Sequence, residues 1–392
     1  MFYLSLWWKI RYRVSPTERG EPLPNTPCIP DELPLANLDW RKLLPLAGRA
    51  NAALARYDGM LQTLPNPGVL LSPITVNEAV LSSRIEGTQA TLEEVLERDA
   101  GIEAPENRRG DIEEISNYRS AVGFAEAELL NRPISLSLVK TVHQLLMQGV
   151  RGRDKTPGAF REDQNWIGRQ GDSIEKARFV PPSPMILGAK LDEWEAYLQT
   201  EDEDPILQAA IAHAQFEILH PFKDGNGRIG RMLVPLLLYK RGALSSPMFY
   251  LSEYLEARRD VYYDHLLAIT RSGDWQSWLE FFVEAVVAQA EGNLGKVKQI
   301  RDLYENMRRE FLEVTHSQYA GAAVDAFFAR PIIRATDFRQ VVGFNTRVTA
   351  NNMLRQLENS GHIRKVRDGA GPIPSVYALP ALINIAEGRP VF

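Results

Sequence analysis

The sequence predicts a mainly α-helical protein with one small β-hairpin in its centre and a separate module of mixed structure at its C-terminus. Apolar residues recur at helical spacing from Asp39 to about residue 314. Residues 151–183 interrupt this pattern with many turn residues, and within them residues 167–180 favour a short hairpin. Because the chain has 392 residues, 44% of them hydrophobic, it is long enough for two or three domains.

The overall composition excludes several classes of protein. A net charge of −5 excludes a generally basic nucleic-acid binder but leaves room for a local basic patch. A single cysteine, Cys28, cannot form an internal disulfide and fits a reducing compartment, so we expect a cytoplasmic location. The apolar start is interrupted by Lys9 and Arg11, which makes it too short for a signal peptide or a membrane span.

Residues 1–38 are predicted to form an extended N-terminal arm, because much of this stretch is rich in proline and aperiodic. An N-terminal helical region, residues 39–130, follows the arm. Within it, Ser72-Pro73 or Thr75 begins a helix that runs to about residue 86, since serine or threonine caps and an early proline are start signals. Residues 91–94, Thr-Leu-Glu-Glu, form a capping box for the next helix.

The central part of the chain is predicted to be a helical core over residues 131–290, followed by a linker helix over residues 291–325. Periodicity and caps favour helices at residues 111–130, 135–149, 185–200, 205–219, 251–271, 274–290 and 291–314.

Residues 326–392 change character. A short helix ends at Gly343, a second runs from Thr346 to about Ser360, and two alternating strands follow. This order predicts a winged helix-turn-helix domain. From Pro331 onward, eight basic residues stand against four acidic ones, a net charge of +4. Such a domain either contacts DNA through residues 331–379, with the second helix in the major groove, or binds another protein.

One stretch carries the strongest chemical pattern: His220-Pro-Phe-Lys-Asp-Gly-Asn-Gly-Arg-Ile-Gly-Arg231, between two apolar helical segments. Its glycines permit unusual backbone angles or a close approach to a ligand. Free N–H groups just before a helix form an anion site. Arg228 and Arg231 are three residues apart, so they point to the same side of the first turn. The pattern therefore predicts a phosphate site with a histidine base beside it.

This stretch resembles the signature of the Fic family (filamentation induced by cyclic AMP), written HPFxDGNGRxxR, and matches every specified position. Further segments typical of that family are Gly158-x-Phe160-Arg161, Gln164-Asn-Trp-Ile-Gly168, Ala177-Arg-Phe-Val-Pro-Pro182 and Leu251-Ser-Glu-Tyr254. The resemblance extends over residues 40 to 290. It makes residues 131–290 the catalytic core and implies a protein adenylyltransferase, which transfers AMP from ATP to a Ser, Thr or Tyr hydroxyl of a protein.

The resemblance also implies a role for each motif residue. His220 would be the general base, and Asp224 would hold Mg²⁺. The backbone of Gly225, Asn226 and Gly227 would bind phosphates, and Arg228 and Arg231 would neutralise the β- and γ-phosphates. Family members with lysine at the position of Gly227 phosphorylate their targets instead, so glycine favours AMP transfer. ATP and Mg²⁺ are the expected cofactors.

Residues 82–87, Ser-Ser-Arg-Ile-Glu-Gly, resemble the inhibitory motif of the family. Ser82 and Glu86 lie on one helix face. Paired with Arg231, the Glu86 carboxylate would take the place of the γ-phosphate. We therefore expect a self-inhibited enzyme whose inhibitory helix, residues 75–86, precedes the catalytic motif.

Other expectations concern ligands and partners. Tyr262 and Tyr263 either pack against adenine or belong to the core. The hairpin near residues 167–182 would bind the protein substrate by β-strand addition. Self-modification and a homodimer are also expected. Two alternative functions remain: a nucleotide-responsive DNA-binding regulator, and Glu86-dependent removal of AMP from modified proteins.

Overall fold

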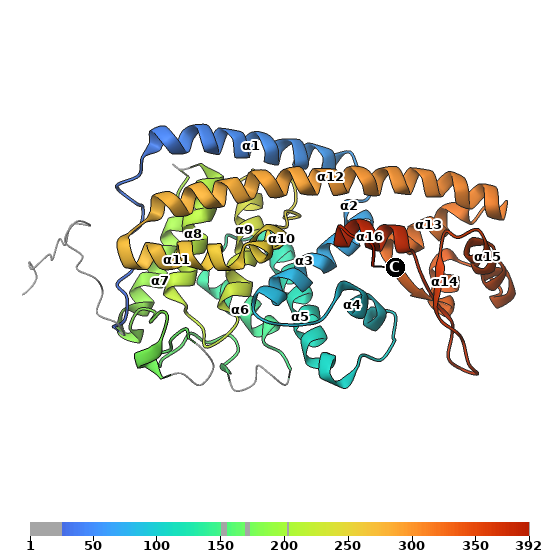
Figure 1. The fold of residues 1–392 in the computed structure, drawn as a ribbon, viewed down its shortest axis with the longest axis horizontal. Coiled ribbons are helices and arrows are strands. Elements are labelled where there is room, and N and C mark those ends of the chain that lie inside the picture. Colours follow the sequence, from blue (N-terminus) through green and yellow to red (C-terminus); the bar gives the residue numbers. More distant parts are fainter. Residues whose placement is uncertain (1–25, 150–154, 169–172, 202–203, 392) are drawn as a thin grey trace, which may run out of the picture.

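Two long helices, α1 (Trp40–Gln62) and α12 (Trp275–Thr315), run side by side along one edge of the protein (Figure 1). The structure is a computed structural model that describes residues 26–149, 155–168, 173–201 and 204–391. Most of the predicted arm lies outside the described residues. Among the described residues, none of the helices combines the length and the apolar composition needed to span a bilayer.

The sequence-based division into helices at residues 274–290 and 291–314 is wrong, because α12 is continuous over 41 residues. The change from apolar to charged composition that suggested a break marks a change of surroundings instead. The first half of α12 is largely buried against α1 and the central helices of the protein, whereas the second half buries one face, through Val297, Ile300, Met307 and Phe311. The helix therefore extends beyond the core to the C-terminal module (Figure 1).

The central layer consists mainly of helices that precede and follow the motif. Every residue of α8 from Ile206 to Phe216 is buried, as expected of a helix that is apolar on all sides. The helices of this layer are α5 (Glu106–Leu129), α6 (Leu136–Leu146), α7 (Pro184–Leu198), α8 (Pro205–Leu219), α9 (Asn226–Lys240), α10 (Ser252–Ala257) and α11 (Arg259–Ser272). The predicted helix at residues 251–271 is thus two helices, since Arg258 leaves the helical conformation with φ −125° and ψ 34°.

The predicted helix after Ser72-Pro73 is confirmed as α3 (Ser72–Ile85), and it lies between the central layer and the C-terminal module. A short helix, α2 (Pro67–Leu70), precedes it. The capping box is also confirmed, since Thr91 and Glu94 exchange both bonds at the start of α4 (Leu92–Asp99).

The hairpin expected over residues 167–180 is reduced, within its described part, to one antiparallel bridge between Ile167 and Phe179. A 3₁₀ turn, η3 (Ile174–Lys176), occupies its second half. Below the bridge, the Cys28 N–H donates to the carbonyl of Val180 at 3.0 Å, so the described end of the N-terminal arm pairs with the base of this flap.

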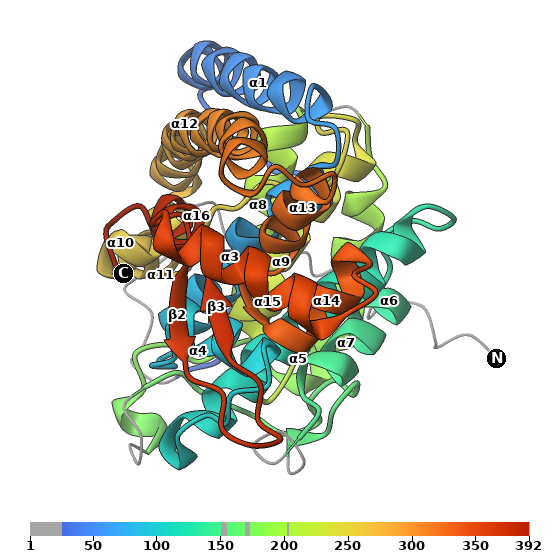
Figure 2. The same ribbon diagram turned by 90° about the vertical axis from the view of Figure 1, so that its right-hand side faces the viewer.

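The C-terminal module contains the predicted helix pair and hairpin. Its elements are α13 (Ala320–Ala329), β1 (Ile332–Arg334), α14 (Ala335–Val342), α15 (Arg347–Asn359), β2 (Arg364–Arg367), β3 (Val376–Ala378) and α16 (Pro380–Glu387). The three strands form an antiparallel sheet in the order β1-β3-β2. Figure 2 shows β2 and β3 side by side. The final helix, α16, was not expected, and it packs on both α3 and α12.

Candidate active site

His220 ends α8 in the left-handed conformation, with φ 45° and ψ 58°. For a residue with a side chain this conformation costs about 1–2 kcal/mol, so the surroundings must hold it. Arg161, which is 3% exposed, does so: its Nε donates to the His220 carbonyl at 2.9 Å and its Nη2 to the Pro182 carbonyl at 2.6 Å. One buried guanidinium thus joins the catalytic turn to the base of the flap.

His143 supports the same loop from α6. Its ring stacks on Phe222 with centroids 3.7 Å apart. The Gly158 N–H donates to Nδ1 at 2.9 Å, and Nε2 lies 3.1 Å from the Asp224 carbonyl. Since Nδ1 accepts, the proton must be on Nε2, which donates to Asp224. Burial lowers the pKa of His143 to about 4, which keeps this neutral tautomer.

The start of α9 presents unpaired backbone N–H groups. Gly225 precedes the helix with φ 80°, and a Cβ there would lie 3.1 Å from Sδ of Met147. The Asn226 side chain is used internally, because it accepts from the Phe222 N–H and donates to the Phe222 carbonyl, both at 2.9 Å. The amides of residues 226–228 lie in the first turn and have no intrahelical acceptor. A helix start of this kind suits an anion, and the anion site predicted from the sequence stays a prediction.

Arg228 is 4% exposed and lies between two carboxylates. Its Nη1 donates to Glu114 of α5 at 3.1 Å, and its Nη2 lies 3.5 Å from Oδ1 of Asp224. The same Oδ1 accepts the Gly225 N–H at 2.6 Å. The Asp224 side chain remains 48% exposed, so it borders the site on the solvent side.

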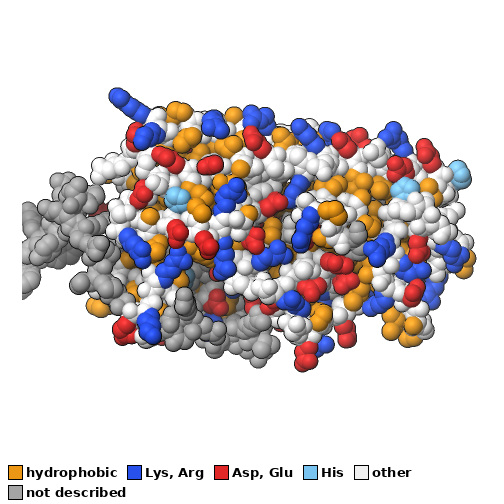
Figure 3. Space-filling view, in the orientation of Figure 1, with side chains coloured by type: hydrophobic (Ala, Val, Ile, Leu, Met, Phe, Trp, Pro, Cys, Tyr) orange, Lys and Arg blue, Asp and Glu red, His pale blue; other side chains and the backbone are white. Residues whose placement is uncertain are grey.

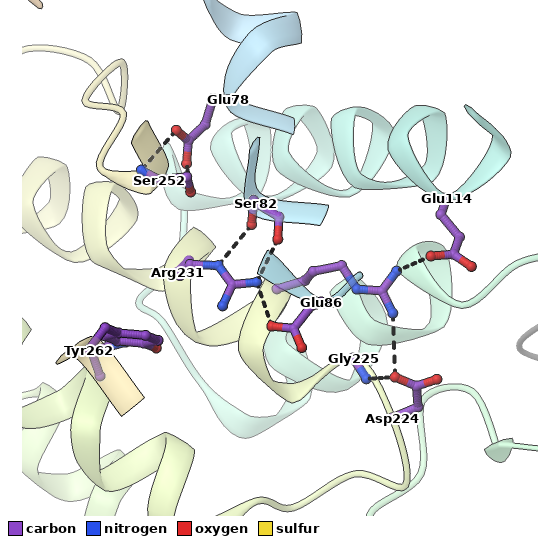
Figure 4. A network of polar contacts seen from close by, with 11 residues as sticks. Glu78, Ser82, Glu86, Glu114, Asp224, Gly225, Arg231, Ser252 and Tyr262 are labelled. Carbon is purple, nitrogen blue, oxygen red and sulfur yellow. Dashed lines mark hydrogen bonds and ion pairs between the residues drawn. The ribbon is translucent and has the colours of Figure 1, made fainter. Parts of the chain in front are cut away.

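Arg231 is held by α3 and by Glu86, which directly follows that helix (Figure 4). Its Nε donates to Oγ of Ser82 at 3.0 Å, and its Nη2 donates both to the Ser82 carbonyl at 2.8 Å and to Oε1 of Glu86 at 2.7 Å. Arg231 is 3% exposed, whereas the Glu86 side chain is 33% exposed. The structure therefore brings Ser82, Glu86 and Arg231 together across 145 residues of sequence.

The charges around this pair fix its protonation. Burial raises the pKa of Glu86, but the charge and hydrogen bond of Arg231, followed by the charge of Arg228, outweigh it, so the net shift is downward. A lowered pKa means that the Glu86–Arg231 contact is fully present above the usual range of a glutamate and weakens only in acid. Burial and the Arg161 charge lower the pKa of His220 to about 4, so its ring is neutral at neutral pH.

A second carboxylate, Glu78, attaches the same helix one turn before Ser82. It accepts from the Ser252 N–H at 3.1 Å and from the Ser252 hydroxyl at 2.5 Å, at the start of α10 (Figure 4). Burial raises the pKa of Glu78 to about 7, against the effect of these bonds. Glu78, Ser82 and Glu86 are spaced four residues apart, so one face of α3 makes all the polar contacts with the catalytic helices.

Gly227 limits how Glu86 can be placed. A Cβ built on Gly227 would overlap Oε1 of Glu86 and come within 2.9 Å of Nη1 of Arg231. We expect Gly227→Ala to reduce the free energy of unfolding by about 1–3 kcal/mol in the wild type. In a Glu86→Gly background most of this cost should disappear. Urea unfolding of the wild type, the two single variants and the double variant tests this expectation. An equal loss of stability in both backgrounds would contradict the placement of Glu86 against Gly227.

Of the two tyrosines proposed for adenine, Tyr262 fits the core alternative. Its ring is fully buried, and its hydroxyl lies 2.9 Å from Nε2 of His213 (Figure 4 shows Tyr262 beside the Arg231 network). Tyr263 lies at the edge of the site. Burial, and to a lesser degree the charge of Glu86, raise its pKa to about 12.

Sequence reasoning missed several residues that organise the site. Arg161 lies in a family-like segment but has no role assigned from the sequence, and nothing in the sequence around His143 indicates its contacts with this loop. Glu78 and Glu114 give no local signal, because their partners Ser252 and Arg228 are 174 and 114 residues away.

Two family models match the chain: the Fic/DOC family N-terminal model over residues 44–126 and the Fic/DOC family model over residues 133–238. Protein adenylyltransferase Fic of Aedes aegypti is 28% identical over 176 residues, which are 44% of this chain and 32% of that protein. Protein adenylyltransferase fic-1 of Caenorhabditis elegans is 26% identical over 210 residues, 52% of this chain and 38% of that protein. The matched part of the chain thus spans about a third of the length of these two relatives.

Solved structures share the fold. A Fic family protein from Desulfovibrio desulfuricans superposes with a TM-score of 0.55 and 20% identity, over 86% of this chain and 95% of that one. Fic-1 from C. elegans superposes with a TM-score of 0.51 and 21% sequence identity, over 67% of this chain and 75% of that one. The helical fold, the motif loop and the matching family models lead to one conclusion: residues 44–126 and 133–238 form Fic/DOC family N-terminal and Fic domains.

Proposed function

We propose that this protein is an adenylyltransferase that transfers AMP from ATP to a serine, threonine or tyrosine hydroxyl of a protein. The observation that carries the proposal is the left-handed His220 turn, held by Arg161, directly before the first-turn amides of α9 and two buried arginines. The names of the relatives, protein adenylyltransferases, support the same chemistry.

The reaction assigns a step to each group. The target oxygen attacks the α-phosphorus while its proton passes to the His220 ring. The bond from the α-phosphorus to the bridging oxygen breaks, and pyrophosphate leaves. The amides of Asn226 and Gly227, with Arg228 and Arg231, stabilise the negative charge that develops on the phosphates.

Asp224 is the residue that would hold Mg²⁺. Its carboxylate is half exposed at the mouth of the site, and Oδ1 is fixed by the Gly225 N–H. Within the described ranges, no group of three or more His, Cys, Asp or Glu side chains could hold an ion by itself. This fits a cation bound by one carboxylate and the substrate phosphates, which it would neutralise.

Glu86 makes the enzyme self-inhibited in this proposal. Its Oε1 binds the guanidinium that would otherwise bind the γ-phosphate, so ATP cannot place its α-phosphorus in line with the target oxygen. The reverse reaction, removal of AMP from a modified protein, would require Glu86 to orient a water molecule. The direct contact of Glu86 with Arg231 favours inhibition.

The flap is the proposed docking site for the protein substrate. Trp166 and Ile167 are 42% and 39% exposed beside the Ile167–Phe179 bridge, which offers backbone for strand addition. A segment paired there would present its hydroxyl to His220, because Arg161 and Asn165 join the flap base to the motif loop. Self-modification and a homodimer stay part of the proposal.

Two labels on ATP test the chemistry. The Glu86→Gly variant is incubated with Mg²⁺ and cell lysate, once with α-labelled and once with γ-labelled ATP. Transfer of AMP predicts labelled protein from the α-label alone. Protein labelled from the γ-phosphate would mean phosphorylation, and no label from either would contradict transferase activity.

We propose DNA binding as a second function, with α15 as the helix that contacts duplex DNA. Its exposed face combines arginine, asparagine, glutamine and threonine, the side chains that read base edges: Arg347, Thr349, Asn351, Asn352, Arg355 and Gln356. Glu358, the one carboxylate of α15, bonds to Lys365 instead. The Thr346 side chain caps the helix, so its N-terminal turn is the part that would enter the groove.

Several other basic residues of the module are paired with carboxylates and are therefore less available to contact DNA. Arg334 pairs with Asp337, Lys365 with Glu358 and Asp368, and Arg389 with Glu387. Basic and acidic side chains are also mixed across the face in Figure 3. DNA contact would therefore depend mainly on Arg347 and Arg355.

We expect the full-length protein to shift duplex DNA in a gel at low salt, and Arg347→Ala/Arg355→Ala to abolish the shift. Each lost phosphate contact also lowers the salt dependence of binding. The control Arg49→Ala/Arg56→Ala removes the same charge from exposed positions of α1. No shift by the wild type, or an equal loss in the control, would contradict DNA binding through α15.

A further inference from the structure

The inhibitory helix α3 is held from two sides. One face, with Glu78, Ser82 and Glu86, contacts α9 and α10 of the catalytic core. Asn77, next to Glu78 in sequence, points to a neighbouring face that packs on α16 of the C-terminal module. Figures 1 and 2 show α16 beside α3 in both views.

The contact with α16 is specific. Asn77, 5% exposed, donates from Nδ2 to the Ala386 carbonyl at 2.9 Å. Lys296 of α12 donates to the same carbonyl at 3.2 Å, and also binds both carboxylate oxygens of Glu253 in α10 at 2.9 and 2.8 Å. Ala386 is in the last turn of α16, where carbonyls lack intrahelical donors. An amide from α3 and a cation from α12 therefore cap the final helix.

Both ends of residues 72–101, the segment that contains Ser82 and Glu86, also contact the C-terminal module. At its start, the Ser72 hydroxyl lies 3.4 Å from the Ala329 carbonyl of α13. After α4, a Cβ on Gly101 would be 2.7 Å from Nη1 of Arg334, so the chain passes directly over this guanidinium. Residues 72–101 thus contact the C-terminal module at the beginning, in the middle and at the end.

Charge complements these contacts. On α4, burial raises the pKa of Glu93 and of Glu97, while the charges of Arg364 and Arg367, both on β2, oppose the rise. Two arginines of the proposed DNA-binding module thus face the catalytic half of the chain. They account for two of the eight basic residues counted in this module.

We propose that the C-terminal module is the regulatory element of the active site: docked α16 keeps α3 in the position from which Glu86 reaches Arg231. Undocking of α16 loosens α3 and releases Arg231 for the γ-phosphate. Nothing in the Glu86–Arg231 contact itself requires the module, but that contact forms only when the backbone of α3 is held in register with α9. The proposal rests on the proposed function for its activity readout alone.

Two variants test this coupling in the full-length chain. Asn77→Ala removes the bond from α3 to α16, and Asn77→Ala/Lys296→Met removes both donors to the Ala386 carbonyl. Asn51→Ala is the matched control, because it removes an asparagine that bonds across the α1–α8 junction. Hydrogen exchange of residues 72–86 and incorporation of α-labelled ATP are measured for each.

The expected result is faster exchange over residues 72–86 and a rise in labelling of about two- to tenfold for Asn77→Ala, larger for the double variant, with no change in the control. In a Glu86→Gly background the same substitutions should add nothing to labelling. Unchanged exchange in both variants would overturn the coupling. So would a further rise in the Glu86→Gly background, because the module would then act elsewhere.

Hydrogen exchange is measured without any enzymatic activity. The coupling can therefore be tested even if the proposed function fails. If Glu86→Gly transfers no AMP but exchange over residues 72–86 still accelerates in the Asn77 variants, the transferase proposal fails and the coupling stands. If Glu86→Gly is active and exchange is unchanged, the coupling fails and the transferase proposal stands.

Discussion

Glu86→Gly is expected to raise the initial rate of AMP incorporation by about 10- to 100-fold over the wild type. A hydrogen bond between charged groups contributes about 1.5–3 kcal/mol, and 1.4 kcal/mol is a factor of ten. Glu86 follows α3 as its C-cap with φ −86°, an ordinary conformation, so the substitution changes the charge with little effect on the backbone. Initial rates with α-labelled ATP measure the effect.

The control for this variant is Asp368→Gly, which removes one acidic charge from a side chain that is 90% exposed in the C-terminal module. Its rate should equal that of the wild type. Equal rates for Glu86→Gly and the wild type, with active protein in both, would show that the contact with Arg231 does not inhibit.

His220→Ala in the Glu86→Gly background should reduce the rate by about 10²–10⁴-fold, the usual contribution of a general base. The KM for ATP should change little, because the phosphates bind to the start of α9 and to the arginines. The neutral His220 ring can accept a proton at neutral pH. The kinetic constants of the double variant give both effects.

His316→Asn is the matched control, since His316 is an exposed histidine at the end of α12, in the left-handed conformation that asparagine also adopts. A double variant that retains the rate of Glu86→Gly would exclude His220 as the base.

The local features of this protein are predictable from its sequence. The early proline correctly places the start of α3, whereas the expected serine or threonine cap is wrong, because Leu71 is the N-cap and no side chain caps the helix. The capping box of α4 is complete. The motif residues also predict an anion site at the start of α9, because a helix N-terminus after a glycine turn presents free amides whatever surrounds it.

Contacts between distant segments could not be predicted in this way. Arg161 stabilises the left-handed His220, and Glu78 bonds to Ser252, but neither pairing leaves a periodic pattern in the sequence. The contact between Ser82–Glu86 and Arg231 was expected only through the resemblance to a family. The continuity of α12 was missed because a helix that crosses from the core to a second module changes composition without changing conformation.

The docking of α16 on α3 illustrates the same limit. The Ala386 carbonyl accepts from Asn77, 309 residues away, and a buried asparagine in a helix has no distinctive spacing. The predicted positive surface of the C-terminal module is likewise reduced, because the sequence cannot reveal which arginines face acidic residues of α4.

The central claim is that Glu86 and the γ-phosphate compete for Arg231, and comparison of ATP with ADP tests it most directly. Calorimetric Kd values are measured for both nucleotides with His220→Ala, which prevents turnover, and with His220→Ala/Glu86→Gly. Competition predicts that Glu86→Gly tightens ATP binding by about 10- to 100-fold and leaves ADP, which has no γ-phosphate, nearly unchanged. An equal gain for both nucleotides, or no gain for ATP, would contradict it.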